Sequence, residues 1–154
     1  DQGGAGQWRG QPGTLNVKKV MRPSTAMAWV VSRRHPLQGL CGGEKASPYR
    51  NWFNLGTPEE YEIENTALAQ LKEGAVVAYQ QGGGSGFGPA IKRDPQKVVD
   101  DVLDELVSVK AAREKYGVVL KGSLEKYDLE VDAAATKTLR EEMARAQAQK
   151  IAAE

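Results

Sequence analysis

Glycine and proline are concentrated in the first part of this chain. All but two of the 17 glycines lie at or before Gly88, and all seven prolines lie at or before Pro95. Glycine disfavours helix because of its backbone freedom, and proline lacks a backbone donor, so a long helix is excluded from this part. The distribution predicts an α+β chain: a glycine-rich, strand-containing, mainly β region over residues 1–93, then a helical C-terminal region over residues 94–154.

Four segments of the first region have strand patterns. They span residues 14–21, 26–32, 59–65 and 75–81. The first alternates apolar and polar residues, which is typical of a half-buried strand, while the second and fourth are short apolar runs with β-branched residues. In the third, Tyr61 and Ile63 share one face and glutamates occupy the other, which indicates a strand at an exposed sheet edge.

The second region contains helix signals. Asp94 is placed to cap a helix that begins with Pro95, and valines and leucines then recur at spacings of three and four residues. Ser108 is a candidate cap for a second helix, and residues 118–120 are expected to form a short strand. A last helix, rich in alanine and in charged residues, is expected to begin near Asp132. It lacks a strong apolar stripe, so we expect it to fray or to dock on a neighbour.

The stretch QQGGGSGFG raises the possibility of a phosphate-binding loop. Gly83 and Gly88 have the glycine separation of a P-loop, but no lysine follows them to reach the phosphates. The GxGxxG fingerprint of dinucleotide-binding proteins does not fit these glycines in any register. Consecutive glycine amides could still form an anion-binding nest, which makes Gly82, Gly83 and Gly84 the weak candidates for cofactor binding. The favoured alternative is a structural turn.

Charge and cysteine content exclude several classes of protein. The chain has 21 basic and 20 acidic residues, a net charge of +1, so nucleic acid and anionic membranes are not expected partners. The sequence contains no apolar run that could span a membrane and does not start with a signal-peptide pattern, so a cytoplasmic location is expected. With one cysteine and one histidine, an internal disulfide and a closed zinc site built by this chain alone are excluded. His35 and Cys41 could still lend ligands to a site shared with another chain, but the favoured expectation is that the chain has no metal ligands.

The remaining reactive side chains do not identify a catalytic group. Cys41 is interpreted as a small buried thiol, and His35 as a turn residue before a proline. Neighbouring carboxylates, such as Asp100 and Asp101, are interpreted as solvent-exposed helix residues, because adjacent helical residues point in different directions. With a single histidine and no nucleophile-elbow pattern, the catalytic residues stay unknown.

Four segments, in the same order, resemble the hydantoinase B and oxoprolinase family. GGAGQWRGQPGTLNVKKV resembles its glycine-rich GGAGxxRGGxG segment, and LQGLCGGEKASP resembles its GLFGG turn. QQGGGSGFGPAIKRDPQKVVDDVLDELVSVKAAREKYGVVL is similar to its GGGGYGDPxxRDP ending, and VDAAATKTLR resembles its closing helix. One departure is that the aspartate of GYGDP is missing after Gly88. The resemblance spans nearly all of the chain.

The resemblance implies a part in a multi-subunit, ATP-dependent enzyme. Hydantoinase B-like chains work with a hydantoinase A-like partner that has an actin and sugar-kinase type nucleotide fold. Such enzymes open cyclic amides or carboxylate ketones such as acetone and acetophenone. Because family members are several times longer, the resemblance implies a C-terminal piece of a larger polypeptide or a separately encoded small subunit. ATP and a divalent metal are implied for the larger hydantoinase B-like and hydantoinase A-like partner chains, with no cofactor bound by this chain.

The resemblance also bears on the glycines and on Arg9. Glycine-dense runs in this family are expected to pack as extended, polyproline-like segments. Arg9 lies among such glycines, where its guanidinium could grip a carboxylate or phosphate, or could donate to backbone carbonyls. The expected role of the chain is to complete a structure and a site. The alternative is a non-enzymatic assembly or scaffold module, and a free-standing nucleotide-binding enzyme is disfavoured.

Overall fold

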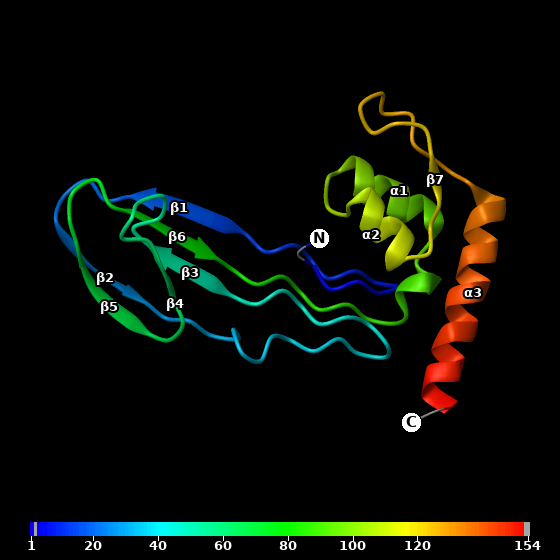
Figure 1. Ribbon diagram of the computed structural model, residues 1–154, viewed down its shortest axis with the longest axis horizontal. Coiled ribbons are helices and arrows are strands. Elements are labelled where there is room, and N and C mark those ends of the chain that lie inside the picture. The colour runs from blue at the N-terminus through cyan, green and yellow to red at the C-terminus, as the bar shows by residue number, and fades with distance from the viewer. Residues whose placement is uncertain (2, 153–154) are drawn as a thin grey trace.

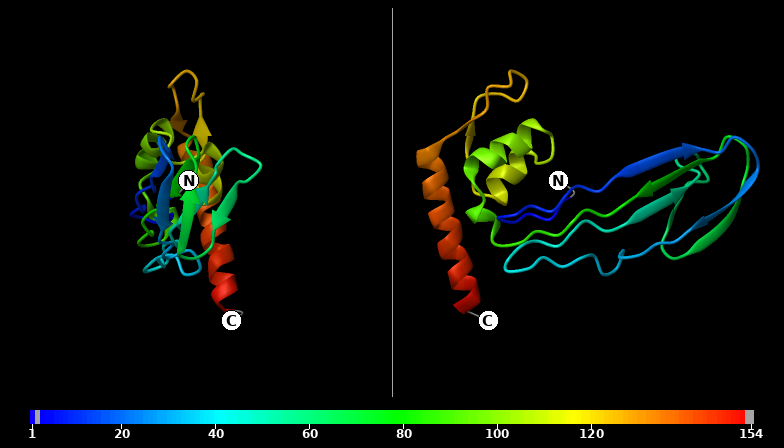
Figure 2. Two further views of the ribbon diagram at one scale, coloured as in Figure 1. Left: turned by 90° about the vertical axis from the view of Figure 1, so that its left-hand side faces the viewer. Right: turned by 180° about the vertical axis from the view of Figure 1, so that it is seen from behind.

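The computed structural model describes residues 1 and 3–152, and the molecule is elongated (Figure 1). The strands β1 to β6 gather at one end and the helices at the other, and long extended segments run between the two ends. The view from behind in Figure 2 shows the same separation, with α3 standing across the helical end. The molecule therefore has the α+β composition expected, with β1 to β6 in the first part of the chain and only the short pair β7 and β8 among the helices.

The largest sheet has four antiparallel strands in the order β1-β6-β3-β4. The strands are β1 (Leu15–Lys19), β6 (Val76–Gln80), β3 (Arg50–Phe53) and β4 (Tyr61–Ile63). The edge position expected for the strand with Tyr61 and Ile63 is confirmed. The strand β3 was not predicted. It lies between Pro48 and Asn54, and Asn54 adopts a left-handed φ of 57°.

A second sheet is a two-stranded ribbon of β2 (Ser24–Ala28) and β5 (Ala67–Leu71). The predicted strand over residues 26–32 is thus wrong in its bounds, since β2 starts two residues earlier and ends at Ala28. Its length is set by pairing with β5, an unpredicted strand of alternating small and large residues. Beyond it, Ser32 has a φ of 54°, which is incompatible with a continuing strand.

The ribbon packs on one face of the larger sheet. Phe53, Ile63 and Val77 from that sheet form a buried cluster with Ala28 and Leu71 from the ribbon. All five residues of β1 are exposed, so the prediction of a half-buried first strand is wrong. The alternating pattern correctly places Leu15 and Val17 on one face of β1, because their partners on β6 are also two residues apart. The side chains of Leu15 and Val17 are nevertheless 57% and 53% exposed.

Three glycine-rich segments connect the two ends, over residues 3–13, 39–47 and 81–88. They lie side by side and exchange backbone hydrogen bonds, for example from Gly4 to Gly84, from Glu44 to Ala5 and from Gly86 to Glu44. A Cβ atom added at Gly10 or Gly86 would lie less than 3.0 Å from a carbonyl oxygen of a neighbouring segment. Glycine is therefore required here for backbones to approach one another.

The helical end is built on a separate core. It contains η1 (Ala90–Lys92), α1 (Pro95–Leu103), α2 (Val109–Glu114), the short pair β7 (Leu120–Lys121) and β8 (Glu130–Val131), and α3 (Ala133–Ala152). The predicted caps are confirmed: Asp94 accepts from the Gln96 amide and Ser108 from the Ala111 amide. Val98, Val99 and Val102 of α1 are buried with Tyr116, and Ala5 reaches this core from the first glycine-rich segment.

Candidate functional site

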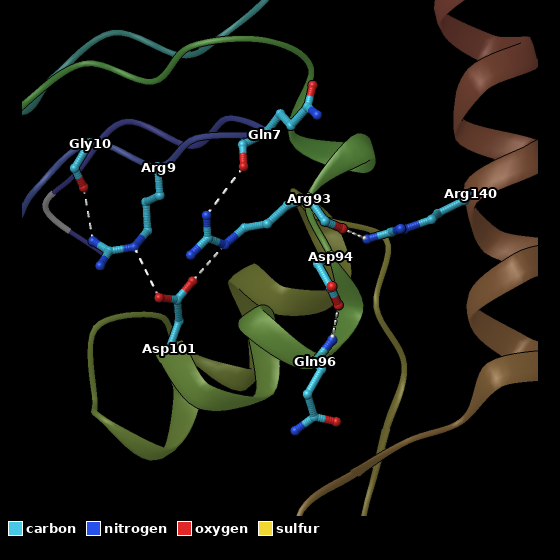
Figure 3. Close-up of polar contacts among 8 residues, drawn as sticks. All are labelled: Gln7, Arg9, Gly10, Arg93, Asp94, Gln96, Asp101 and Arg140. Carbon is cyan, nitrogen blue, oxygen red and sulfur yellow. Dashed lines mark hydrogen bonds and ion pairs between the residues drawn. The ribbon is translucent and has the colours of Figure 1, made fainter.

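A cluster of charged side chains lies where the glycine-rich segments meet α1 (Figure 3). Asp101 lies between two arginines: its Oδ1 is 3.4 Å from Nε of Arg9, and its Oδ2 is 2.8 Å from Nε of Arg93. All three side chains are only 9–11% exposed. The two guanidinium groups share one carboxylate, so the cluster carries one uncompensated positive charge.

Each arginine also binds the backbone of the first glycine-rich segment. An Nη1 donor of Arg9 lies 2.9 Å from the Gly10 carbonyl, and Nη1 of Arg93 lies 3.2 Å from the Gln7 carbonyl. Both alternatives considered for Arg9 are therefore present, since its guanidinium contacts a carboxylate and a backbone carbonyl. These contacts hold the extended segment against α1, and they leave Arg9 largely occupied by the protein itself.

Arg140 of α3 extends the cluster on its other side (Figure 3). Its Nη2 donates to the Arg93 carbonyl at 2.7 Å, and its Nε donates to the Tyr116 carbonyl at 3.1 Å. Burial lowers the pKa of Arg140 from its ordinary value, and the charge of Asp94 acts in the opposite direction. Its two hydrogen bonds go to neutral carbonyls, and within residues 3–149 it forms no ion pair.

The backbone amides of the QQGGGSGFG stretch point to partners inside the protein. The Gly83 N–H donates to the Ser47 hydroxyl at 3.0 Å, and the Gly84 N–H donates to the Gln11 carbonyl at 2.8 Å. Gly82 lies close to the Ser47 carbonyl, where a Cβ would meet it. An anion nest needs successive amides that are free to converge on a ligand. The geometry of these candidates favours the packing interpretation.

The two reactive residues of the sequence do not form a site. Cys41 is exposed, so its interpretation as a buried thiol is wrong; it occupies a turn with a φ of 51°. His35 lies in a bend before Pro36, as expected. Across the part of the chain that the structure describes, three or more His, Cys, Asp or Glu residues do not gather as a metal site would require. In the same part, every helix is too short or too polar to cross a membrane.

Comparison with known proteins identifies the family of this chain. The sequence pattern of hydantoinase B/oxoprolinase proteins matches residues 1–90, which is more than half of the chain. The chain belongs to the hydantoinase B/oxoprolinase family. This hydantoinase B-type chain is 32% identical to caprolactamase subunit beta of Pseudomonas jessenii over 129 residues. It is also 30% identical to an uncharacterized protein of Methanocaldococcus jannaschii over 150 residues.

Solved structures share the fold of this hydantoinase B-type chain. An acetone carboxylase matches 97% of it with a TM-score of 0.73 and 23% identity, which shows the shared fold alone. The ATP-dependent caprolactamase of Pseudomonas jessenii matches 91% of it with a TM-score of 0.65 and 27% identity. The chain spans only 22% of caprolactamase subunit beta and 24% of each matched structure.

The sequence indicated Arg9 but not its two charged partners in this hydantoinase B-type chain. The prediction that Asp101 faces solvent is wrong, because it lies three residues after the fully buried Val98 and so shares the inward face of α1. That spacing was the available signal. Arg93 directly precedes the helix cap, and nothing in its local sequence indicates a partner 86 residues away at Gln7.

Proposed function

We propose that this chain is the C-terminal piece, or a separately encoded small subunit, of a multi-subunit ATP-dependent enzyme of the hydantoinase, oxoprolinase and ketone carboxylase type. Its role is to complete the structure and the site of a larger hydantoinase B-like chain. A hydantoinase A-like chain supplies the ATP site, and the divalent metal belongs to the partner chains. The enzyme works in the cytoplasm and either opens a cyclic amide or carboxylates a ketone.

The observation that carries this proposal is the pattern of coverage. Caprolactamase subunit beta matches 80% of this chain, while the chain spans 22% of that protein. The matched acetone carboxylase and caprolactamase structures are described as ATP-dependent, and the same fold makes up about a quarter of each matched chain. A fold that occurs as a quarter of larger chains is expected to work together with the remainder.

The geometry supports a structural role in such an enzyme. The amides of Gly83 and Gly84 bind acceptors in the protein, and the Arg9 guanidinium binds Asp101 and Gly10. These groups are the candidates for ligand binding that the sequence suggested. The two glycine amides join the glycine-rich segments to one another, and Arg9 joins the first of these segments to α1. Catalysis by this chain alone is therefore not part of the proposal.

Reconstitution tests the proposal. The chain is co-expressed with a larger hydantoinase B-type chain lacking the matching quarter and with a hydantoinase A-type chain. ATP consumption is then measured with caprolactam, hydantoin, oxoproline, acetone or acetophenone. We expect ATP-dependent turnover of one substrate only when all three chains are present. Turnover that is equally fast without this chain contradicts a site-completing role.

The alternative is a non-enzymatic assembly module. The exposed Leu15 and Val17 on the edge strand β1 favour it, since such a surface suits docking on a partner sheet. The same reconstitution separates the two roles. If the complex forms only in the presence of this chain, but turnover continues after the chain is removed from the assembled complex, the chain acts as a scaffold.

A further inference from the structure

A depression with basic walls lies beside the charged cluster, between the first glycine-rich segment, the start of α1 and α3. It has a volume of about 430 Å³, within the size range of small-molecule sites. Its charged and aromatic lining comes from Trp8, Lys92, Arg93, Asp94, Lys97 and Arg140. Figure 3 shows Arg93, Asp94 and Arg140 of this group around the beginning of α1.

The charges in this depression are unbalanced. Four cationic side chains line it against the single carboxylate of Asp94, and that carboxylate already accepts a hydrogen bond from the Gln96 amide at 2.8 Å. Lys97 places its ammonium 5.5 Å from the centre of the Trp8 ring. Among residues 3–149, Lys92, Lys97 and Arg140 form no ion pair.

The buried cluster behind the depression does not remove this excess of positive charge, because the Arg9 and Asp101 charges that it adds cancel each other. Arg93 lines the depression and at the same time belongs to the cluster in which two guanidinium groups share the carboxylate of Asp101. The side chains of this cluster are about nine-tenths buried, so water screens their excess charge poorly. A buried charge without a counter-charge is costly, and an anion in the adjoining depression would offset it.

We propose that this depression binds a small oxyanion, the phosphate or carboxylate group of a small molecule. Lysine ammonium and arginine guanidinium groups are the usual protein partners of such groups. Lys92 and Lys97 provide exposed donors, while the largely buried Arg93 and Arg140, held by hydrogen bonds to the backbone, provide a fixed positive field. The site needs no free glycine amide, and it does not depend on the proposed enzymatic role.

Titration of the full chain with inorganic phosphate, and separately with acetate, tests the proposal by calorimetry at constant ionic strength. Chloride serves as the reference anion. We expect phosphate or acetate to bind with a dissociation constant of at most about 1 mM. The preferred anion identifies whether the natural ligand carries a phosphate or a carboxylate. Absence of binding by both anions up to about 20 mM overturns the proposal and favours an acidic side chain of a partner as the occupant.

Two variants locate the binding. Lys92→Ala with Lys97→Ala should weaken it at least fivefold with little change in melting temperature, because both side chains are exposed. The control double variant, Lys19→Ala with Lys72→Ala, removes the same charge at the far, strand-rich end and should change the affinity for the anion less than twofold. Equal losses in the two double variants would show an adventitious effect of net charge and overturn the site.

Asp94→Asn provides a test with the opposite sign. Asparagine keeps the cap of α1 but removes the carboxylate that Asp94 contributes to the depression. Anion binding should therefore tighten by a factor of about 2 to 5. An unchanged affinity in a variant that folds normally would place the anion elsewhere and overturn the proposal.

Discussion

Close backbone contact explains why single glycines matter in this molecule. At Gly10 a Cβ would clash with the Gly84 carbonyl, while its φ lies outside the left-handed region. We expect Gly10→Ala to destabilise the fold by about 3 kcal/mol, through overpacking alone. Gly74→Ala is the matched control, because its φ of 87° costs about 1 kcal/mol but nothing lies within 4 Å of its Cβ. Chemical denaturation of both variants measures the difference, and equal losses contradict the packing explanation.

The carboxylate of Asp101 stabilises two nearly buried guanidinium groups. We expect Asp101→Asn to destabilise the fold by about 3 to 5 kcal/mol, because it leaves both arginines without a counter-charge. Asp100→Asn is the control at the neighbouring, exposed position and should change stability by less than about 0.5 kcal/mol. Similar melting temperatures for both variants would show that the cluster contributes little.

Tyr116 gives the helical core a pH dependence. Burial raises the pKa of its phenol from 10.0 to about 12. The pKa of the phenol is higher in the folded chain than in the unfolded chain. The stabilisation from burying the neutral phenol is therefore complete below pH 10 and is lost as the pH rises toward 12. We expect Tyr116→Phe to flatten the fall in stability between these pH values, whereas Tyr127→Phe, at an exposed tyrosine, should not. Urea denaturation at several pH values provides the measurement.

Among the elements, α3 is attached to the core through a single buried hydroxyl as well as through Arg140. The Oγ1 atom of Thr136 accepts the Val119 amide at 3.0 Å, just before β7. Thr136→Val should destabilise the fold by about 1 to 3 kcal/mol, because the amide loses its acceptor in a buried place. Thr136→Ser keeps the hydroxyl and should cost less. Thermal denaturation followed by circular dichroism compares them, and equal melting temperatures contradict this contact.

At the scale of the whole molecule, the outer face of the larger sheet is the surface that we expect a larger hydantoinase B-type chain to cover. Val17→Glu places a charge on this face of β1 and should weaken co-elution with that chain at least tenfold, with little effect on folding, because Val17 is exposed. Gln70→Glu adds the same charge on the exposed surface of β5 and serves as the control. Size-exclusion chromatography of the co-expressed chains is the measurement. Normal co-elution of the Val17 variant would place the interface elsewhere.

Features that depend on neighbouring residues could be predicted from the sequence. The caps at Asp94 and Ser108, the buried valine stripe of α1 and the exposed edge strand at Tyr61–Ile63 follow from local patterns. The ordered glycine-rich segments also indicated the family before any comparison. These signals are readable because capping, helical periodicity and strand alternation act over a few residues.

Features that join distant segments could not be predicted from local patterns and are seen in the folded chain alone. The strands β3 and β5 are stabilised by pairing with their partner strands, so their own residues carry little signal. The exposure of β1 depends on whether a layer covers its outer face, which alternation cannot show. The partners of Asp101 come from positions 92 and 8 residues away, Arg9 and Arg93. These three side chains meet because the glycine-rich segments run from one end of the molecule to the other and bring Arg9 against α1. Such long-range contacts depend on the packing of the whole chain.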